Sequence, residues 1–269
     1  MTIQYDVQGS VGVITIASGK VNPMSPAMHR ELHEVLVRFL ADDQVHCGVL
    51  RGDGERAFCA GDDMKVETVE LDSPEAQLRS ELSPVHRLPG ADESWEWAYE
   101  NATMDRYKPI VGSVRGWCLG GGLALLLGLT DIRVAGDDAK FGLPEIAYGM
   151  GGAGGYMRLT RSIPYTAAMS LLLTGDTIDA NEARRIHLVN EVVPAQDAFG
   201  RALAIAKKIA SHPPLSVRLE MEATLHADDM TRRDAYRYGD RLYQLQRLAA
   251  GESESASFAR ARNKGTSES

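Results

Sequence analysis

The chain has 269 residues, of which 44% are hydrophobic and 25% are charged, and its formal net charge is −8 at pH 7. This is the composition of a globular protein, long enough for one sizeable core or for a core with a small appendage. The acidic balance argues against a nucleic-acid partner, which requires clustered positive charge. The N-terminus has no signal-peptide pattern and no apolar run reaches the roughly 18 residues of a membrane span, so we expect no membrane association and a cytoplasmic location.

The cysteines predict neither a disulfide framework nor a metal site. Cys47, Cys59 and Cys118 are odd in number and scattered along the chain. Unpaired, widely spaced thiols are typical of a protein in a reducing compartment. No metal-ligating spacing accompanies them.

The first fifty residues predict a hairpin, a helix and a strand. Residues 3–7 and 11–17 alternate in strand fashion on either side of Gly9 and Ser10. Residues 28–40 carry apolar side chains at helical spacing, and Ser25 and Pro26 provide a helix cap and a first-turn proline. A strand is expected over 45–50, followed by the small-residue segment 56–65.

Residues 66–107 are the least regular part of the chain. They contain Trp95, Trp97 and Tyr99, and a helix is expected over 94–104. One interpretation is a surface excursion whose aromatic side chains pack on the body of the protein. The other is a lid that shapes a binding pocket.

Three consecutive glycines, Gly120 to Gly122, lie between an expected strand over 109–114 and an expected helix over 123–129. Backbone N–H groups at such a turn converge on one point, and a glycine lets a polarised oxygen approach them closely. The triplet is therefore half of a candidate oxyanion hole. Close packing of helix against strand is the alternative explanation.

A loop that bears a carboxylate follows the next expected strand, over 132–135. It reads Phe-Gly-Leu-Pro-Glu over 141–145 and ends at Glu145. Residues 149–154 then match a Gly-x-Gly-x-x-Gly pattern, with Asp176 near the spacing of a ribose-binding acid. We reject a dinucleotide site, because no apolar strand precedes these glycines. Further on we expect helices over 165–174 and 180–185, an extended segment over 188–193 and helices from 197, with breaks at 213–214 and 227–229.

Three ordered motifs together resemble the crotonase superfamily, the enoyl-CoA hydratase/isomerase family. They are Phe-Cys-Ala-Gly-Asp-Asp-Met-Lys over 58–65, Gly-Trp-Cys-Leu-Gly-Gly-Gly over 116–122, and the 141–145 segment. The resemblance extends over nearly the whole chain. It implies an α/β fold, a spiral of ββα turns over 1–195 with a variable, lid-like insertion at 66–107, and a C-terminal helical oligomerisation region over 196–269 that forms homotrimers or homohexamers.

The resemblance also implies an acyl-CoA substrate, with coenzyme A as part of the substrate and no permanently bound cofactor or metal. The thioester oxygen would lie between the N–H groups of Ala60 and Gly121, which stabilise an enolate. The other substrate contacts implied in this way are Asp62, Asp63, Met64, Gly120 and Trp117.

One departure from the family pattern bears on the reaction. Hydratases of the family generally carry two glutamates, but here the first position is Ala124 and only Glu145 remains. One carboxylate suffices to move a proton between carbons, so double-bond isomerisation is favoured over hydration. Hydration stays open if a second acid comes from water or from the 66–107 segment, where the candidates are Glu96, Glu100 and Asp105.

Other interpretations of these residues also remain. Glu145 has an alternative role as a salt-bridged loop carboxylate, and Cys59 and Cys118 are expected to be buried residues that flank the hole. Relatives with this fold also act as thioester or C–C hydrolases, decarboxylases or dehalogenases. A non-catalytic acyl-CoA-binding protein is a further alternative.

Overall fold

The computed structural model describes residues 2–66, 73–75, 96–151 and 159–250. The chain forms two compact units: Met1–Asp105 with Ile110–Ala210, and Arg106–Pro109 with Ser211–Ser269. The first unit therefore includes the helix that ends at Ala210, beyond the predicted core boundary at residue 195.

Two sheets form the framework of the first unit. The larger has the order β1-β2-β3-β5-β7-β10; β1 pairs antiparallel with β2, and every other pairing in it is parallel. Its strands are β1 (Thr2–Gln8), β2 (Val11–Ala17), β3 (Cys47–Gly52), β5 (Ile110–Val114), β7 (Ile132–Gly136) and β10 (Glu191–Val193). The smaller sheet has the order β4-β6-β8-β9, with strands β4 (Ala57–Cys59), β6 (Trp117–Leu119), β8 (Lys140–Gly142) and β9 (Thr177–Asp179).

From β3 to β8, successive strands of the chain alternate between the two sheets. β3 leads to β4, β5 to β6 and β7 to β8, so each successive turn places one strand in each sheet. Helix α4 (Gly121–Leu129) closes the turn that begins with β5. This arrangement confirms the expected α/β spiral.

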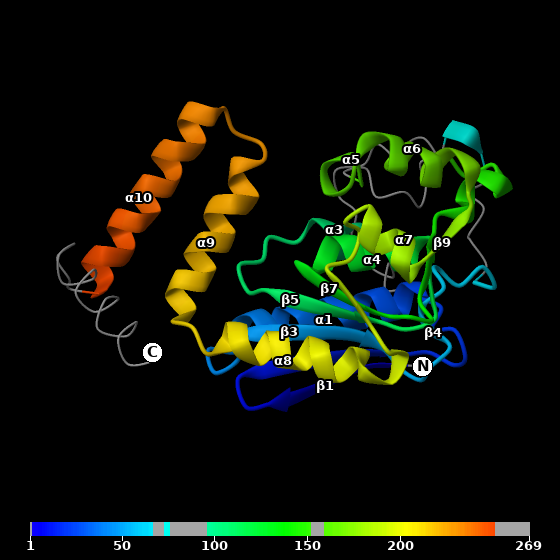
Figure 1. Ribbon diagram of the computed structural model, residues 1–269, viewed down its shortest axis with the longest axis horizontal. Coiled ribbons are helices and arrows are strands. Elements are labelled where there is room, and N and C mark those ends of the chain that lie inside the picture. The colour runs from blue at the N-terminus through cyan, green and yellow to red at the C-terminus, as the bar shows by residue number, and fades with distance from the viewer. Residues whose placement is uncertain (1, 67–72, 76–95, 152–158, 251–269) are drawn as a thin grey trace. The chain divides into compact units, whose positions relative to one another are not determined.

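Alternating side chains give the larger sheet two buried faces. Val49 and Val111 belong to a cluster with Ala202 and Ala206 of α8 (Ala198–Ala210). Leu50 belongs instead to the main core, with side chains from α4 and from α1 (Pro26–Ala41). Helix α8 lies along one face of the sheet (Figure 1). A sheet covered on both faces is expected where the strands are parallel and apolar.

The first predicted elements are confirmed closely. β1 and β2 form the hairpin, and α1 begins after Ser25, whose hydroxyl accepts a hydrogen bond from the N–H of Met28 at 3.3 Å. The expected helix over 94–104 is α3 (Glu96–Thr103); the rest of the predicted insertion over 67–72 and 76–95 lies outside the described residues.

Two of the remaining helices in the first unit confirm predicted ones: α6 (Tyr165–Thr174) and α7 (Ala180–Arg185). Three short helices of this unit were not predicted: η2 (Pro144–Tyr148), α5 (Leu159–Ser162) and η3 (Ala195–Asp197). In the second unit, α9 (Pro214–Ala227) and α10 (Arg232–Ala250) pack on one another, separated by the predicted turn near Asp228.

Candidate functional site

The glycine triplet starts α4, but it follows β6 rather than β5 directly. Gly120 has φ +54° and ψ −129°, and its N–H donates to the carbonyl of Gly142 at 3.0 Å. A Cβ on Gly122 would collide with the carbonyl of Cys59 in the neighbouring strand. Close packing therefore explains Gly122, whereas Gly121, at the start of the helix, presents one of the N–H groups that a helix leaves without an internal acceptor.

Glu145 lies against this turn. It belongs to η2, after β8, and a Cβ on Gly120 would collide with its Oε1 atom. Burial raises the pKa of Glu145 above its usual value; its own backbone N–H offsets part of this shift, and the nearby Asp62 carboxylate adds to it. Oε2 is buried and accepts no hydrogen bond from the described residues. Within the described part of the chain this oxygen is therefore not engaged in the salt bridge that the sequence left as an alternative for Glu145.

Ala60 does not present the N–H group that the sequence analysis assigned to it. This N–H donates to the carbonyl of Val21 at 3.0 Å, so it is already used by the fold. The correction has a structural cause, because residues 60–63 run beside residues 21–24 and make alternate hydrogen bonds to them.

These alternate hydrogen bonds leave the N–H of Asp62 without a backbone acceptor in the described residues. Met24 donates to the carbonyl of Gly61 at 3.0 Å and accepts from the N–H of Asp63 at 2.8 Å. Successive N–H groups of an extended chain point to opposite sides, so that of Asp62 points away from Met24. A Cβ on Gly61 would lie 3.5 Å from the nitrogen of Gly121, which shows how closely the two turns approach.

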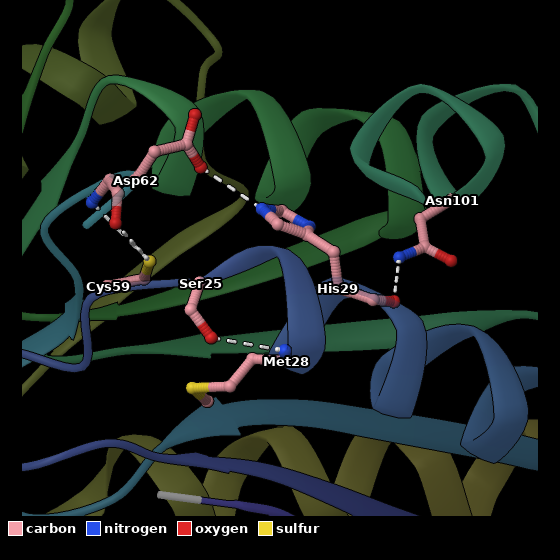
Figure 2. Close-up of polar contacts among 7 residues, drawn as sticks. Ser25, Met28, His29, Cys59, Asp62 and Asn101 are labelled. Atoms are coloured by element: carbon pink, nitrogen blue, oxygen red, sulfur yellow. Dashed lines mark hydrogen bonds and ion pairs between the residues drawn. The ribbon is translucent and has the colours of Figure 1, made fainter. Parts of the chain in front are cut away.

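The Asp62 side chain makes a contact that the sequence analysis missed. Its Oδ1 lies 3.0 Å from Nε2 of His29, a side chain that is 1% exposed on the inner face of α1. The backbone carbonyl of His29 accepts a hydrogen bond from Nδ2 of the buried Asn101, in α3, at 2.7 Å. Figure 2 shows the Asp62 carboxylate directed at the His29 ring, with Asn101 on the far side. The sequence signal for this contact was His29 itself, a polar residue on the face of α1 that otherwise carries apolar side chains.

The other predicted contact residues lie near these turns but differ in exposure. Met64 is 76% exposed and Trp117, in β6, is 40% exposed. The Asp63 carboxylate accepts from the N–H of Lys65 at 3.1 Å. Ala124 is half-buried in α4.

Cys59 and Cys118 are buried, as predicted, and face each other as partners across β4 and β6. Burial raises the pKa of the Cys59 thiol to about 12 and that of Cys118 well above its usual value. A neutral, buried thiol is a poor nucleophile. These residues therefore form part of the wall behind the turn.

Asn22 is a second position whose role the sequence did not disclose. It is fully buried, has φ +50°, and its Nδ2 donates to the carbonyls of Asp53 and Ala57 at 3.0 and 2.9 Å. Its Oδ1 accepts from the N–H of Ser18 at 3.0 Å. This one side chain fixes the segment that leads into Asp62.

Two features are absent from the described residues. No helix within them is both long enough and apolar enough to span a bilayer. In the same part of the chain, no cluster of three or more His, Cys, Asp or Glu side chains has the arrangement of a metal site.

Comparison with known proteins points to one family. The model of the family described as enoyl-CoA hydratase/isomerase matches residues 6–256. An (E)-benzylidenesuccinyl-CoA hydratase of Thauera aromatica is 32% identical over 249 residues, which cover 92% of this chain and 91% of that protein. A short-chain-enoyl-CoA hydratase of Clostridium acetobutylicum is 34% identical over 222 residues, covering 80% of this chain and 78% of that protein.

The solved structures give the same result for the fold. The enoyl-CoA hydratase of Bacillus anthracis superposes with a TM-score of 0.78 at 28% identity, covering 98% of this chain and 96% of that one.

Proposed function

Because the chain belongs to the enoyl-CoA hydratase/isomerase family, we propose that it acts on an acyl-CoA thioester through an enolate, with Glu145 as the principal proton-transfer group. The observation that carries this proposal is the half-buried Glu145 carboxylate, which lies against the glycine turn and has an oxygen, Oε2, with no partner among the described residues.

The oxyanion hole in this proposal uses the N–H groups of Asp62 and Gly121. Neither donates to the protein backbone in the described structure, and the turns that carry them approach closely. Two donors aimed at the thioester oxygen stabilise the charge that develops when the α-carbon gains or loses a proton. The half-buried Asp63, the exposed Met64 and Lys65, and Trp117 then border the coenzyme A portion of the substrate.

Glu145 alone can move a double bond. Its carboxylate removes a proton from one carbon of the enoyl chain, the enolate forms, and the carboxyl group returns the proton to another carbon. The raised pKa of Glu145 suits this exchange, since it brings the ionised and neutral forms closer in free energy at neutral pH.

Hydration is the second candidate reaction. Several similar proteins are named hydratases, which favours water addition as the net activity. Both reactions share the enolate and the Glu145 proton. The hydrolase, decarboxylase and dehalogenase alternatives use the same hole with other side chains, and they are separated by the products formed from a panel of acyl-CoA esters.

The test is Glu145→Gln. Glutamine keeps the size and one hydrogen-bonding oxygen but accepts no proton, so kcat should fall by about 10²- to 10⁴-fold while affinity for the CoA ester changes little. Exchange of the α-protons of a saturated acyl-CoA with deuterated water reports this step without requiring the true substrate. Glu182→Gln is the control, because Glu182 is a surface carboxylate that pairs with Arg185 at 2.6 Å. Wild-type exchange in Glu145→Gln refutes the proposal.

We further propose that the C-terminal helical region makes the protein a homotrimer or homohexamer and that it works in the cytoplasm. Helix α10 carries apolar side chains that the described chain leaves exposed, although Leu242 is buried; the exposed ones include Tyr236, Leu245 and Leu248.

A further inference from the structure

A second carboxylate faces the glycine turn beside Glu145. A Cβ on Gly121 would lie 2.9 Å from Oδ1 and 3.0 Å from Oδ2 of Asp62, just as one on Gly120 would collide with Glu145. The two carboxylates thus approach neighbouring glycines of one turn. The Asp62 side chain is 40% exposed, so it is not enclosed by the protein.

A buried histidine holds the Asp62 carboxylate in place. An ionised carboxylate can only accept, so when Asp62 is ionised the tautomer with a hydrogen on Nε2 of His29 makes the 3.0 Å hydrogen bond. The hydrogen bond from Asn101 to the His29 carbonyl connects the backbone of α1 to α3 at this point. A surface carboxylate whose only role is solubility needs no contact with a buried histidine, because water solvates it.

The charge of Asp62 also reaches Glu145. The pKa of Glu145 is raised mainly by burial, and the Asp62 carboxylate contributes to the shift. A carboxyl group with a raised pKa holds a proton more readily, and addition of water requires such a donor for the α-carbon.

We propose that Asp62 is the second proton-transfer group of the site, in place of the carboxylate missing at Ala124, and that it makes water addition to an enoyl-CoA the main reaction. The inference rests on the proposed function, because it needs the oxyanion hole and Glu145 to work as described. His29 is a positioning residue that acts through Asp62.

The protons balance as follows. The Asp62 carboxylate takes a proton from a water molecule, whose oxygen bonds to the β-carbon. The π pair between the α- and β-carbons becomes the enolate double bond between the α-carbon and the thioester carbon, and the carbonyl π pair moves onto the thioester oxygen. The neutral Glu145 carboxyl group then gives its proton to the α-carbon. Asp62 ends protonated and Glu145 ionised, and the proton passes back to Glu145 before the next turnover.

The decisive variant is Asp62→Asn, which keeps the backbone N–H and an oxygen that can accept from His29. Hydration of a panel of trans-2-enoyl-CoA esters is followed by the loss of conjugated thioester absorbance, and α-proton exchange is measured in parallel. We expect kcat for hydration to fall about 10²- to 10⁴-fold and exchange to fall far less. Glu34→Gln is the control, because Glu34 is an exposed carboxylate on α1 whose contact with Arg30 is 3.7 Å long.

Two His29 variants test the positioning role. His29→Gln keeps an N–H donor near the position of Nε2, whereas His29→Leu removes it. We expect His29→Leu to lose kcat for hydration with little change in KM, and His29→Gln to recover most of the loss. Thermal melts of both variants show whether they are folded.

The outcomes separate the two proposals. Asp62→Asn that hydrates within about threefold of wild type overturns the role of Asp62, as does a parallel loss of hydration and exchange. A wild-type protein that exchanges α-protons but hydrates no ester also overturns it, while the enolate chemistry stands. If the wild type does neither, or Glu145→Gln keeps full exchange, the proposed function fails and this inference fails with it.

Discussion

Gly120→Ala separates the stability of the turn from its catalytic geometry. The backbone at Gly120 has φ +54° and ψ −129°, a conformation that side chains other than glycine adopt only under strain. The added Cβ also falls on Oε1 of Glu145, with the carboxyl carbon 3.2 Å away. The carboxylate must therefore retreat by about 1 Å to regain an ordinary van der Waals separation.

The two effects have different magnitudes. The backbone strain should lower the free energy of unfolding by about 1–3 kcal/mol. Displacing the carboxylate adds little to this loss, because it is the free end of a flexible side chain. A shift of about 1 Å in a proton-transfer group, however, should lower kcat by about 10²-fold.

Gly9→Ala is the matched control. Gly9 has φ +64° in the β1–β2 turn, and a Cβ there meets no atom within 4 Å. It should lose about 1–2 kcal/mol of stability without any change in kcat. Urea unfolding gives the stabilities, and α-proton exchange with acyl-CoA turnover gives the rates. A Gly120→Ala variant that is destabilised but turns over within about threefold of wild type refutes the placement of Glu145 at this turn.

Three further predictions concern stability and assembly. Because the folded protein raises the pKa of Glu145 from 4.5, this group stabilises the fold below pH 4.5 and that contribution is lost as pH rises through the raised pKa. Glu145→Gln should therefore melt above wild type at pH 7, and the difference should vanish toward pH 4; a lower melting temperature at pH 7 contradicts this sign. Asn22→Ala should cost about 2–4 kcal/mol in urea unfolding, since it leaves buried carbonyl groups without a donor, and a loss under about 1 kcal/mol would show those bonds to be dispensable. Light scattering at micromolar concentration should give the mass of a trimer or hexamer, which a monomer mass would rule out.

Local signals in the sequence were sufficient for much of the fold. The β1–β2 alternation and the Ser25 cap depend on neighbouring residues, so they could be predicted well. The strands β4 and β6 have three residues each, too few for a periodic pattern, and they were missed. Their partners lie far away in the chain, and pairing rather than composition makes them strands.

The candidate site was also only partly predictable from local sequence. The ordered motifs predicted that the glycine turn and Glu145 come together. They did not predict which backbone N–H groups are left without an acceptor in the protein. Ala60 and Asp62 lie in the same short segment, and the sequence does not distinguish their N–H groups. Only the pairing of this segment with residues 21–24 shows that the N–H of Ala60 already donates to a carbonyl group. The contact between Asp62 and His29 spans 33 positions, so no local pattern contained it.

Asn101 bears on how this protein can evolve. It is almost completely buried, donates to the carbonyl of His29, and its Oδ1 lies 3.2 Å from Nδ1 of His33. The chain therefore rejoins the body at a fixed point on α1, whatever precedes it. Doubling the number of residues that connect two fixed points costs only about 0.6 kcal/mol in loop-closure entropy. Residues can therefore be gained or lost between Val66 and α3 at small cost to stability, while the contact between His29 and Asp62 is kept.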